Sequence, residues 1–396
     1  MTIRKYRTLI VASHPVQYAA PLFRAMAEHP NLDVLVAYLS LSGSEPVKDQ
    51  GFGVEVSWDI PLLEGYPWVH VPNQSPKPGV GKFWGLINPE LWQQIITGKF
   101  EAVVVYAGYA YASFWIAAAA ARVNKTAFLF STDASTWRPR DQKVWKAWLK
   151  RFLLPHIFGL ANTVIVSSTP GKQMVQSFKI PEQRIALTPS SVDNDWWIRQ
   201  AAEVDRSKIR TQWDIPESAL VVLFCAKFQS WKRPQDVLRA FANANVNDSY
   251  LVFAGEGALR AELETEAREL DIIEQVKFLG FMNQSQLPSV YRAADLFILP
   301  SEYEPFGVVV NEAMLCGCPV VVSDHVGAGY DLVQDGKTGF IYPCGNVEAL
   351  ATVLREVLPD RERLKRISEA ASQQMETWSP RENVEALVQG IKKSVQ

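Results

Sequence analysis

The chain has 396 residues, enough for about two to three domains of ordinary size. Hydrophobic residues make up 48% and charged residues 21%, which excludes disordered, collagen-like and coiled-coil proteins. The longest mostly apolar run, residues 110–121, is shorter than the roughly 20 residues that a membrane-spanning helix needs. The four cysteines form no CxxC pair, and the apolar run at residues 9–12 is too short for a signal peptide. A cytoplasmic location is therefore expected.

The net charge of −2 hides an uneven distribution. Residues 1–190 carry 19 Lys/Arg and 12 Asp/Glu (net +7), whereas residues 191–396 carry 21 and 30 (net −9). Eight of the 13 tryptophans also precede residue 150. This asymmetry indicates that the two halves contact different partners. Nucleic acid is not expected among them, because the chain has no dense basic run and no zinc-finger or RNA-binding motif.

In the first half, apolar runs of strand length alternate with segments of helical periodicity, as at residues 21–28 and 110–122. Residues 43–89 are rich in Gly, Pro and aromatic residues and predict an insertion with little regular structure. Buried strands are predicted at residues 8–13, 33–39, 102–106, 126–131 and 163–168.

The second half repeats this alternation. Strands are predicted at residues 220–226, 250–255, 276–280, 296–299 and 320–323, and helices at residues 234–244, 258–270, 284–293, 308–316 and 347–358. Continuous apolar strands are typical of parallel sheets with helices on both faces. The predicted class is α/β, with two doubly wound Rossmann-like domains, 1–190 and 191–378, facing across a cleft. Ligands of such sheets bind beyond the carboxyl ends of the strands.

One candidate site follows the predicted strand 296–299. Glu304 lies in the loop after the strand, and Glu312 lies eight residues later inside the next helix. The backbone N–H groups around Phe306, Gly307 and Val308, at the positive end of that helix, favour a phosphate. Carboxylates beside them suit the hydroxyl groups of a ribose or a sugar. Alternatively, Glu304 is only a helix-start charge and Glu312 a solvated helix residue.

A second candidate site contains two lysines. Lys227 follows a buried strand, and Lys232 precedes a helix that Pro234 opens. Two cations at the carboxyl end of a strand can hold a diphosphate and stabilise it as a leaving group. As solvated loop lysines they would carry no function.

These motifs occur in a fixed order that resembles the donor half of the retaining family 4 glycosyltransferases (group 1) of the GT-B fold. The resemblance covers residues 215–396 and ends with a helix after Trp378-Ser379. The matching motifs are Lys227-x4-Lys232, Phe253-Ala254-Gly255-Glu256-Gly257, Phe278-Leu279-Gly280-Phe281, Glu304-x7-Glu312, Gly317-x-Pro319-Val320 and Asp335-Gly336-x-Thr338-Gly339-Phe340.

The resemblance implies transfer of a hexose-type sugar from a UDP- or GDP-sugar to a glycan, a lipid-linked molecule or a small molecule, with no metal. It implies that Lys227 and Lys232 hold the diphosphate; the family more often has Arg at the position of Lys227. It also implies that the last helix, residues 379–396, packs back on the first domain. In the same way, it implies that Glu304 contacts the sugar, Glu312 the ribose, and Gly280 and Phe281 the base, with Gly255 in the same donor site. Other enzymes with this architecture are sugar-nucleotide epimerases and phosphorylases; a non-catalytic nucleotide-sugar scaffold is a further alternative.

Residues of the first half are expected to hold the acceptor. Ser13-His14-Pro15-Val16-Gln17-Tyr18 follows the first strand, where the family usually has a glycine-rich loop. His14, Gln17 and Tyr18 are therefore acceptor-side candidates, although His14 could equally cap the loop. Many relatives have a histidine after the strand matching residues 126–131. This chain has Asp133 there, which can hydrogen-bond a sugar hydroxyl.

Two further motifs resemble those of proteins with other functions. Asp193-Asn194-Asp195 spells the metal-binding DxD motif of another glycosyltransferase fold, but it lies in the predicted interdomain connector. Gly255-Glu256-Gly257 lacks the third glycine of a dinucleotide-binding fingerprint, so hydride transfer is not expected.

The segment 137–158 is basic and aromatic. Trp145, Trp148 and Phe152 occur at helical spacing among Lys143, Lys146, Lys150 and Arg151. Such a helix can lie on an anionic membrane on the cytoplasmic side. Alternatively, it is an ordinary helix that buries its apolar stripe on the first sheet.

Overall fold

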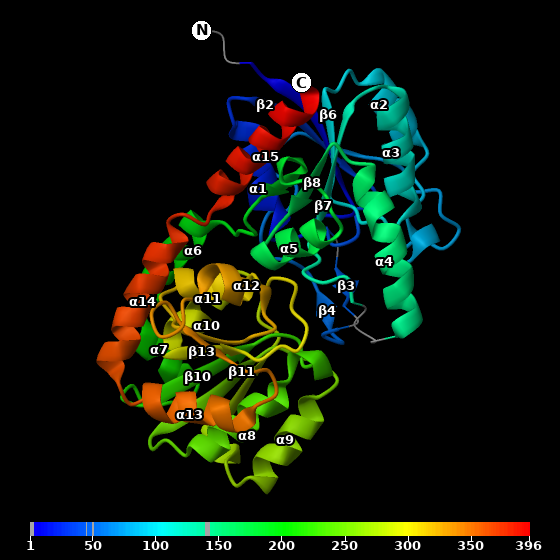
Figure 1. Cartoon of the computed structure of the whole chain (residues 1–396). Helices are drawn as coiled ribbons and strands as arrows, with labels where there is room; N and C mark the ends of the chain where they lie inside the picture. The colour runs from blue at the N-terminus through cyan, green and yellow to red at the C-terminus, as the bar shows by residue number, and fades with distance from the viewer. Residues whose placement is uncertain (1–3, 45, 50, 139–142) are drawn as a thin grey trace. The chain divides into compact units, whose positions relative to one another are not determined.

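The computed structural model describes residues 4–44, 46–49, 51–138 and 143–396 (Figure 1). The chain forms two compact units. Unit 1 consists of Met1–Pro46, Pro61–Val192 and Trp378–Gln396, and unit 2 of Val47–Ile60 and Asp193–Thr377. Each unit contains a parallel sheet with helices between successive strands, which confirms the predicted α/β class and its two Rossmann-like sheets.

Unit 1 is built on a seven-stranded sheet in the order β5-β2-β1-β6-β7-β8-β9, and all its pairings are parallel. Alternate residues of a strand enter different cores, since Leu9 and Val11 of β1 pack on one face and Ile10 on the other. The strands are β1 (Tyr6–Ala12), β2 (Leu32–Tyr38), β5 (Trp68–His70), β6 (Ala102–Val105), β7 (Ala127–Thr132), β8 (Thr163–Val166) and β9 (Ile185–Leu187).

Helices cover both faces of this sheet, as the continuous apolar strands predict. Buried residues of α1 and α15 belong to one core, and those of α2, α3, α4 and α5 to the other. The helices are α1 (Ala19–Glu28), α2 (Glu90–Thr97), α3 (Ala112–Val123), α4 (Val144–Gly159), α5 (Thr169–Ser177) and α15 (Pro380–Val395).

The last helix, α15, packs on the sheet of unit 1 although it follows all of unit 2 in sequence (Figure 1). A capping box between Ser379 and Glu382 begins it. Its buried apolar side chains are those of Val384, Leu387, Val388 and Ile391, which join the core that contains Ile10. This helix is therefore part of the hydrophobic core of unit 1.

Unit 2 contains a six-stranded parallel sheet in the order β12-β11-β10-β13-β14-β15. Its strands are β10 (Leu220–Cys225), β11 (Ser249–Ala254), β12 (Val276–Gly280), β13 (Leu296–Leu299), β14 (Val320–Ser323) and β15 (Phe340–Tyr342). Its helices are α6 (Asn194–Ala202), α7 (Arg206–Gln212), α8 (Pro234–Ala244), α9 (Arg260–Glu269), α10 (Leu287–Ala293), α11 (Val309–Leu315), α12 (Gly327–Leu332), α13 (Val347–Val357) and α14 (Arg361–Met375).

Unit 2 also includes a short antiparallel hairpin from the first half of the sequence, β3 (Val47–Lys48) and β4 (Glu55–Val56). The prediction that residues 1–190 form one continuous domain is wrong for Val47–Ile60. An ion pair between Asp49 and Lys227 and ring contacts with Phe281 hold the hairpin in unit 2. The predicted insertion is also more regular than expected, because β5 joins the edge of the unit 1 sheet.

Candidate functional site

The candidate residues of unit 2 follow the carboxyl ends of four strands that are neighbours in its sheet. Lys227 follows β10, Gly255 follows β11, Gly280 ends β12, and Glu304 lies in the loop after β13. Because the strands are parallel, these loops lie at the same edge of the sheet. This is the edge at which doubly wound sheets bind their ligands.

The two lysines each contact a carboxylate. The Nζ atom of Lys232 donates a hydrogen bond to Oε2 of Glu304, and both side chains are largely buried, with 18% and 14% exposed. The residue after Lys232, Arg233, has a left-handed conformation (φ 52°) just before α8. The structure thus brings together two of the predicted catalytic residues.

Lys227 pairs instead with a residue that the sequence did not indicate. Its Nζ lies 2.8 Å from both carboxylate oxygens of Asp49 and 4.5 Å from the ring centroid of Phe52. Burial disfavours the charged form of Asp49. The hydrogen bonds from Lys227, Phe52 and Gly51 outweigh burial and hold the pKa of Asp49 below its usual value.

Glu312 is buried inside α11, with 6% of the residue exposed. The hydroxyl group of Tyr291, on α10, donates a hydrogen bond of 3.0 Å to its Oε2. Burial raises the pKa of Glu312 to about 8, although the bond from Tyr291 acts in the opposite direction. The alternative of a solvated helix residue is therefore wrong for Glu312.

Glycines allow the backbone segments at this edge to approach one another. Gly255 adopts φ 141°, its N–H donates to the carbonyl of Gly280 at 2.8 Å, and a Cβ atom there would lie 2.1 Å from the carbonyl oxygen of Ala226. Gly255 is therefore required by chain packing. Phe281, the next residue after Gly280, packs edge-on against Phe52 at 4.9 Å between ring centroids.

The loop from Glu304 to α11 is fixed by backbone hydrogen bonds. Gly327 donates to the carbonyl of Glu304 at 3.0 Å, and Ala328 donates to that of Phe306 at 2.8 Å. Gly307 has φ 97°, which favours glycine, and Val308 is the residue that caps the short helix α11. In the first turn of α11, the N–H group of Val310 donates to the carbonyl of Gly307 at 3.0 Å.

Three of the acceptor-side candidates of unit 1 lie between β1 and the start of α1, and the fourth follows β7. Ser13 Oγ lies 3.0 Å from Nδ1 of His14, and burial lowers the pKa of His14. Gln17 is partly exposed, and Tyr18 is the residue that precedes α1. Partial burial, and to a smaller extent the negative charge of Asp133, raise the pKa of Tyr18.

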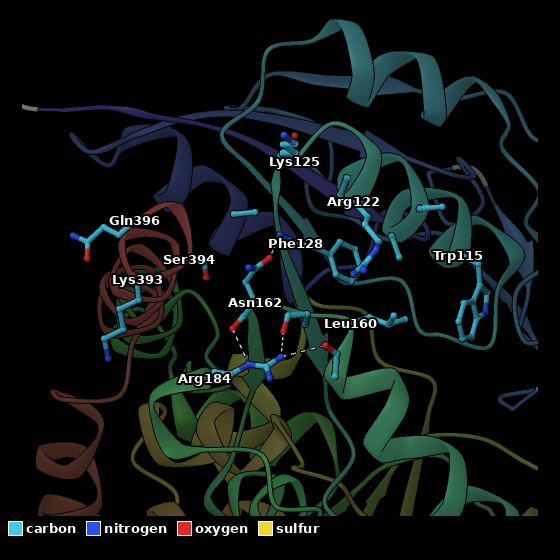
Figure 2. A pocket seen from close by; sticks show the side chains of 17 residues that line it. Trp115, Arg122, Lys125, Phe128, Leu160, Asn162, Arg184, Lys393, Ser394 and Gln396 are labelled. Carbon is cyan, nitrogen blue, oxygen red and sulfur yellow. Dashed lines mark hydrogen bonds between the residues drawn. The ribbon is translucent and has the colours of Figure 1, made fainter.

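A hollow of about 810 Å³ in unit 1 lies at the amino ends of the strands of its sheet (Figure 2). It is lined by residues that precede β7, β8 and β9, including Lys125, Asn162 and Arg184. Arg184 donates hydrogen bonds to the carbonyls of Gly159, Ala161 and Asn162. Figure 2 shows these bonds, which fix the end of α4. Because the hollow lies at the amino ends of the strands, it is not part of the candidate site.

The Asp193-Asn194-Asp195 motif has a local structural role. The Asp193 carboxylate accepts a hydrogen bond of 3.0 Å from the backbone N–H of Trp196 and caps α6. Within the described residues, no group of three or more His, Cys, Asp and Glu side chains is placed to hold a metal ion. In the same part of the chain, no helix is both long and apolar enough to cross a membrane.

Residues 205–374 match the family described as glycosyl transferases group 1. An uncharacterized glycosyltransferase of Methanocaldococcus jannaschii is 30% identical over 202 residues, which are 50% of this chain and 51% of that protein. The D-inositol 3-phosphate glycosyltransferase of Rhodococcus erythropolis is 31% identical over 199 residues, 48% of this chain and 45% of that protein. The matched segments thus span about half of these relatives.

Solved structures match over nearly the whole chain. The structure of Anabaena HepE in complex with UDP and glucose has a TM-score of 0.72 at 20% identity, covering 96% of this chain and 98% of that one. A glycosyltransferase from Rickettsia africae has a TM-score of 0.74 at 17% identity, covering 99% of both chains. At these identities the likeness shows the fold alone, which confirms the predicted GT-B architecture.

Proposed function

We propose that the chain, whose residues 205–374 match the group 1 glycosyl transferases, transfers a sugar from a nucleoside-diphosphate sugar to an acceptor with retention of configuration. The observation that carries this proposal is the pairing of Lys232 with Glu304 at the carboxyl edge of the unit 2 sheet, beside Lys227 and the buried Glu312. The group 1 relatives and the structural likeness to a UDP complex support it.

In this proposal, Lys227 and Lys232 bind the donor diphosphate. Each ammonium group now neutralises a carboxylate, and each would instead offset the charge that develops on the departing diphosphate. The N–H groups around Phe306, Gly307 and Val308 would add donors to the same phosphates. The two lysines supply the positive charge that a metal ion supplies elsewhere, so we propose metal-independent transfer.

Two glutamates would bind the sugars of the donor. Glu304 is adjacent to Lys232, so a diphosphate on the lysine places the attached sugar near the Glu304 carboxylate. Glu312 would bind the ribose, and the backbone at Gly255, Gly280 and Phe281 would border the base. Both glutamates suit hydroxyl groups: Glu304 can present a carboxylate, which would repel a phosphate, and Glu312 presents a buried carboxyl group whose pKa is raised to about 8.

The proposed transfer step needs no protein nucleophile. The acceptor oxygen forms a bond to the anomeric carbon on the same face from which the diphosphate departs. The bond between that carbon and the diphosphate oxygen breaks, and this oxygen takes the acceptor proton. The lysines lower the barrier because negative charge grows on the leaving oxygen.

His14, Gln17, Tyr18 and Asp133 of unit 1 are the proposed acceptor residues. Their aromatic, amide, imidazole and carboxylate groups suit a hydroxylated acceptor, such as a growing polysaccharide or a lipid-linked glycan. The negative charge of Asp133 contributes, after burial, to raising the pKa of the Tyr18 phenol. A neutral His14 can accept a hydrogen bond, because burial lowers its pKa.

We further propose that α4 binds the cytoplasmic face of a membrane. Trp145, Trp148 and Phe152 are 62%, 69% and 59% exposed, so the alternative that they pack on the sheet is wrong for these side chains. Residues 144–153 include no buried residue, and the buried ones, Leu154, Ile157 and Phe158, begin just before Pro155. Exposed aromatics with Lys143, Lys146 and Lys150 nearby are typical of a helix at an anionic interface. The predicted segment 137–158 also includes residues 139–142, which lie outside the described residues.

The test of the transferase is incubation with a panel of UDP- and GDP-sugars, with mass spectrometry of the nucleotide products. Release of UDP or GDP that rises when a hydroxylated acceptor is added is the expected result, and NMR of the product should show the anomeric configuration of the donor. A sugar phosphate or an epimerised donor as product would refute transfer. Inverted product would refute retention.

A further inference from the structure

Residues 47–49 and 51–60, called the hairpin segment below, lie against the loops of unit 2 that carry the proposed donor residues. They contact the loop after β10 through Lys227 and the loop after β12 through Phe281 and its neighbours. The segment is far from both loops in sequence. Its contacts place it beside Lys227 and Phe281, two of the proposed donor residues.

The inner contact of the hairpin segment is ionic. Asp49 accepts hydrogen bonds at 2.7 Å from Gly51 N and 2.9 Å from Phe52 N through Oδ1, so the loop itself orients the carboxylate. Both of its oxygens lie 2.8 Å from Lys227 Nζ. The ammonium group assigned to the donor diphosphate is thus already bound by an oriented anion.

The backbone of the segment also approaches Lys227 closely. A Cβ atom at Gly51 would lie 2.7 Å from Cδ and 2.9 Å from Nζ of Lys227, so only glycine fits here without moving the lysine. Phe52 covers the same ammonium and packs on Phe281, which Trp58 also contacts at 6.5 Å between ring centroids. An aromatic cluster therefore borders the place proposed for the base.

The outer contacts attach the segment to the loop before α10. Asn283 Nδ2 donates to the carbonyl of Ser57 at 2.6 Å, and the carboxylate of Asp59 accepts from the backbone N–H of Ser285 at 3.2 Å. These contacts involve no proposed donor residue. They are independent of the Asp49–Lys227 pair and can be changed separately.

We infer that the hairpin segment is a lid on the donor site and that Asp49 is an internal counter-ion, which holds Lys227 until the donor diphosphate displaces it. The inference rests on the proposed function, because it needs a diphosphate at Lys227. No covalent bond changes in this exchange: one anion replaces another on the same ammonium group. The aromatic side of the lid, Phe52 and Trp58, then lies beside the base.

The test variant is Asp49→Asn. Asparagine keeps a side-chain oxygen for the N–H groups of Gly51 and Phe52 but removes the negative charge that competes for Lys227. By calorimetry, UDP or GDP, whichever the wild type binds, should bind about three- to fivefold more tightly, the upper part of the range expected for a partly exposed ion pair. Inorganic pyrophosphate, which has no base, should show the same gain.

Asp59→Asn is the matched control, since it removes the same charge from the same segment but away from Lys227. It should leave nucleotide affinity within about twofold of wild type. In a Lys227→Gln background, Asp49→Asn should give no gain, because the two changes act on one interaction.

Unchanged or weaker binding by Asp49→Asn would overturn the lid, as would an equal gain in Asp59→Asn or a gain that persists without Lys227. Wild-type protein that binds neither UDP, GDP nor their sugars would refute the proposed function, and the lid with it. A wild type that binds nucleotide while Asp49→Asn shows no gain would refute the lid alone.

Discussion

The Tyr291 hydroxyl donates a hydrogen bond to the carboxyl group of Glu312. Burial raises the pKa of Glu312 to about 8, so this carboxyl group stays protonated near neutral pH. Below about pH 4.5 this group is protonated in both the folded and the unfolded chain. As the pH rises toward 8, the unfolded chain ionises Glu312 while the folded chain does not. The stability present at low pH is therefore lost across this interval.

Glu312→Gln should remove this pH dependence. Relative to wild type, the variant should gain stability between pH 5 and pH 8 by on the order of 2–4 kcal/mol, measured as melting temperatures converted to free energies. Glu369→Gln, at an exposed position of α14, is the control and should show no such trend. A constant difference between wild type and Glu312→Gln across this range would show that Glu312 is ionised in the folded protein.

The two glutamates should differ in which ligand they affect. Glu312→Gln is expected to weaken both free nucleoside diphosphate and the intact donor, since the ribose is common to both. Glu304→Gln is expected to weaken the sugar donor but not the nucleoside diphosphate, because it removes a carboxylate that competes with the diphosphate for Lys232. Calorimetry with both ligands checks this, and equal losses for both ligands in both variants would contradict the division.

Lys232→Ala should lower kcat/KM by at least about 100-fold, which is about 2.7 kcal/mol of transition-state stabilisation. Lys227→Arg should be tolerated, because it keeps the charge and adds donors. Melting temperatures separate this loss from a folding defect, since Lys232→Ala also leaves Glu304 without its partner. A near-normal rate for a folded Lys232→Ala would remove the lysine from the diphosphate site.

A chelator should leave the transfer rate unchanged. The physical reason is that the two lysines would already neutralise the leaving diphosphate in the proposed mechanism, while the Asp193 carboxylate is occupied in capping α6. Rates measured after dialysis against EDTA, with and without added Mg²⁺ or Mn²⁺, test this expectation. Strong loss that the metal restores would identify a metal requirement and make Asp193 and Asp195 the first residues to change.

The exposed part of α4 should contribute to membrane binding and little to folding. Trp148→Ser is expected to change the free energy of unfolding by about 0.5 kcal/mol or less, whereas Phe158→Ala, at a buried position of the same helix, should cost about 3–5 kcal/mol. Thermal unfolding of the two variants provides the comparison.

In the same helix, changing Lys143, Lys146 and Lys150 to Gln should weaken binding to anionic vesicles by about 3 kcal/mol, and added salt should reproduce part of the loss. The charge-matched control changes Lys208, Lys337 and Lys365, which are exposed in unit 2. Vesicle sedimentation that responds equally to both triple variants would mean that α4 is not the docking surface.

Much of the fold was predictable because buried parallel strands appear in the sequence as continuous apolar runs. Residues 276–280, 296–299 and 320–323 are predicted and observed as strands with the same ends, and helix α8 begins at the Pro234 that marks its start. The short edge strands β5, β9 and β15 were missed, because three residues are too few to show a pattern.

The placement of Lys227, Lys232 and Glu304 after strands of the unit 2 sheet was predictable, because each follows a strongly apolar strand. Asp49, Phe52 and Trp58 were not, since they lie in an irregular segment and approach Lys227 and Phe281 only through tertiary packing. Tyr291 gives no local signal either: its partner, Glu312, is 21 residues away on another helix.

The return of α15 to unit 1 has a consequence for synthesis of the chain. Unit 1 cannot complete its core until Val384, Leu387, Val388 and Ile391 have left the ribosome, whereas unit 2 has all its residues by Thr377. During translation, the face of the N-terminal sheet that α1 and α15 share therefore stays partly uncovered until the last helix has been made. A fragment that stops at Val192 would expose this apolar face, so the two units are separable only if the terminal helix is supplied to the first.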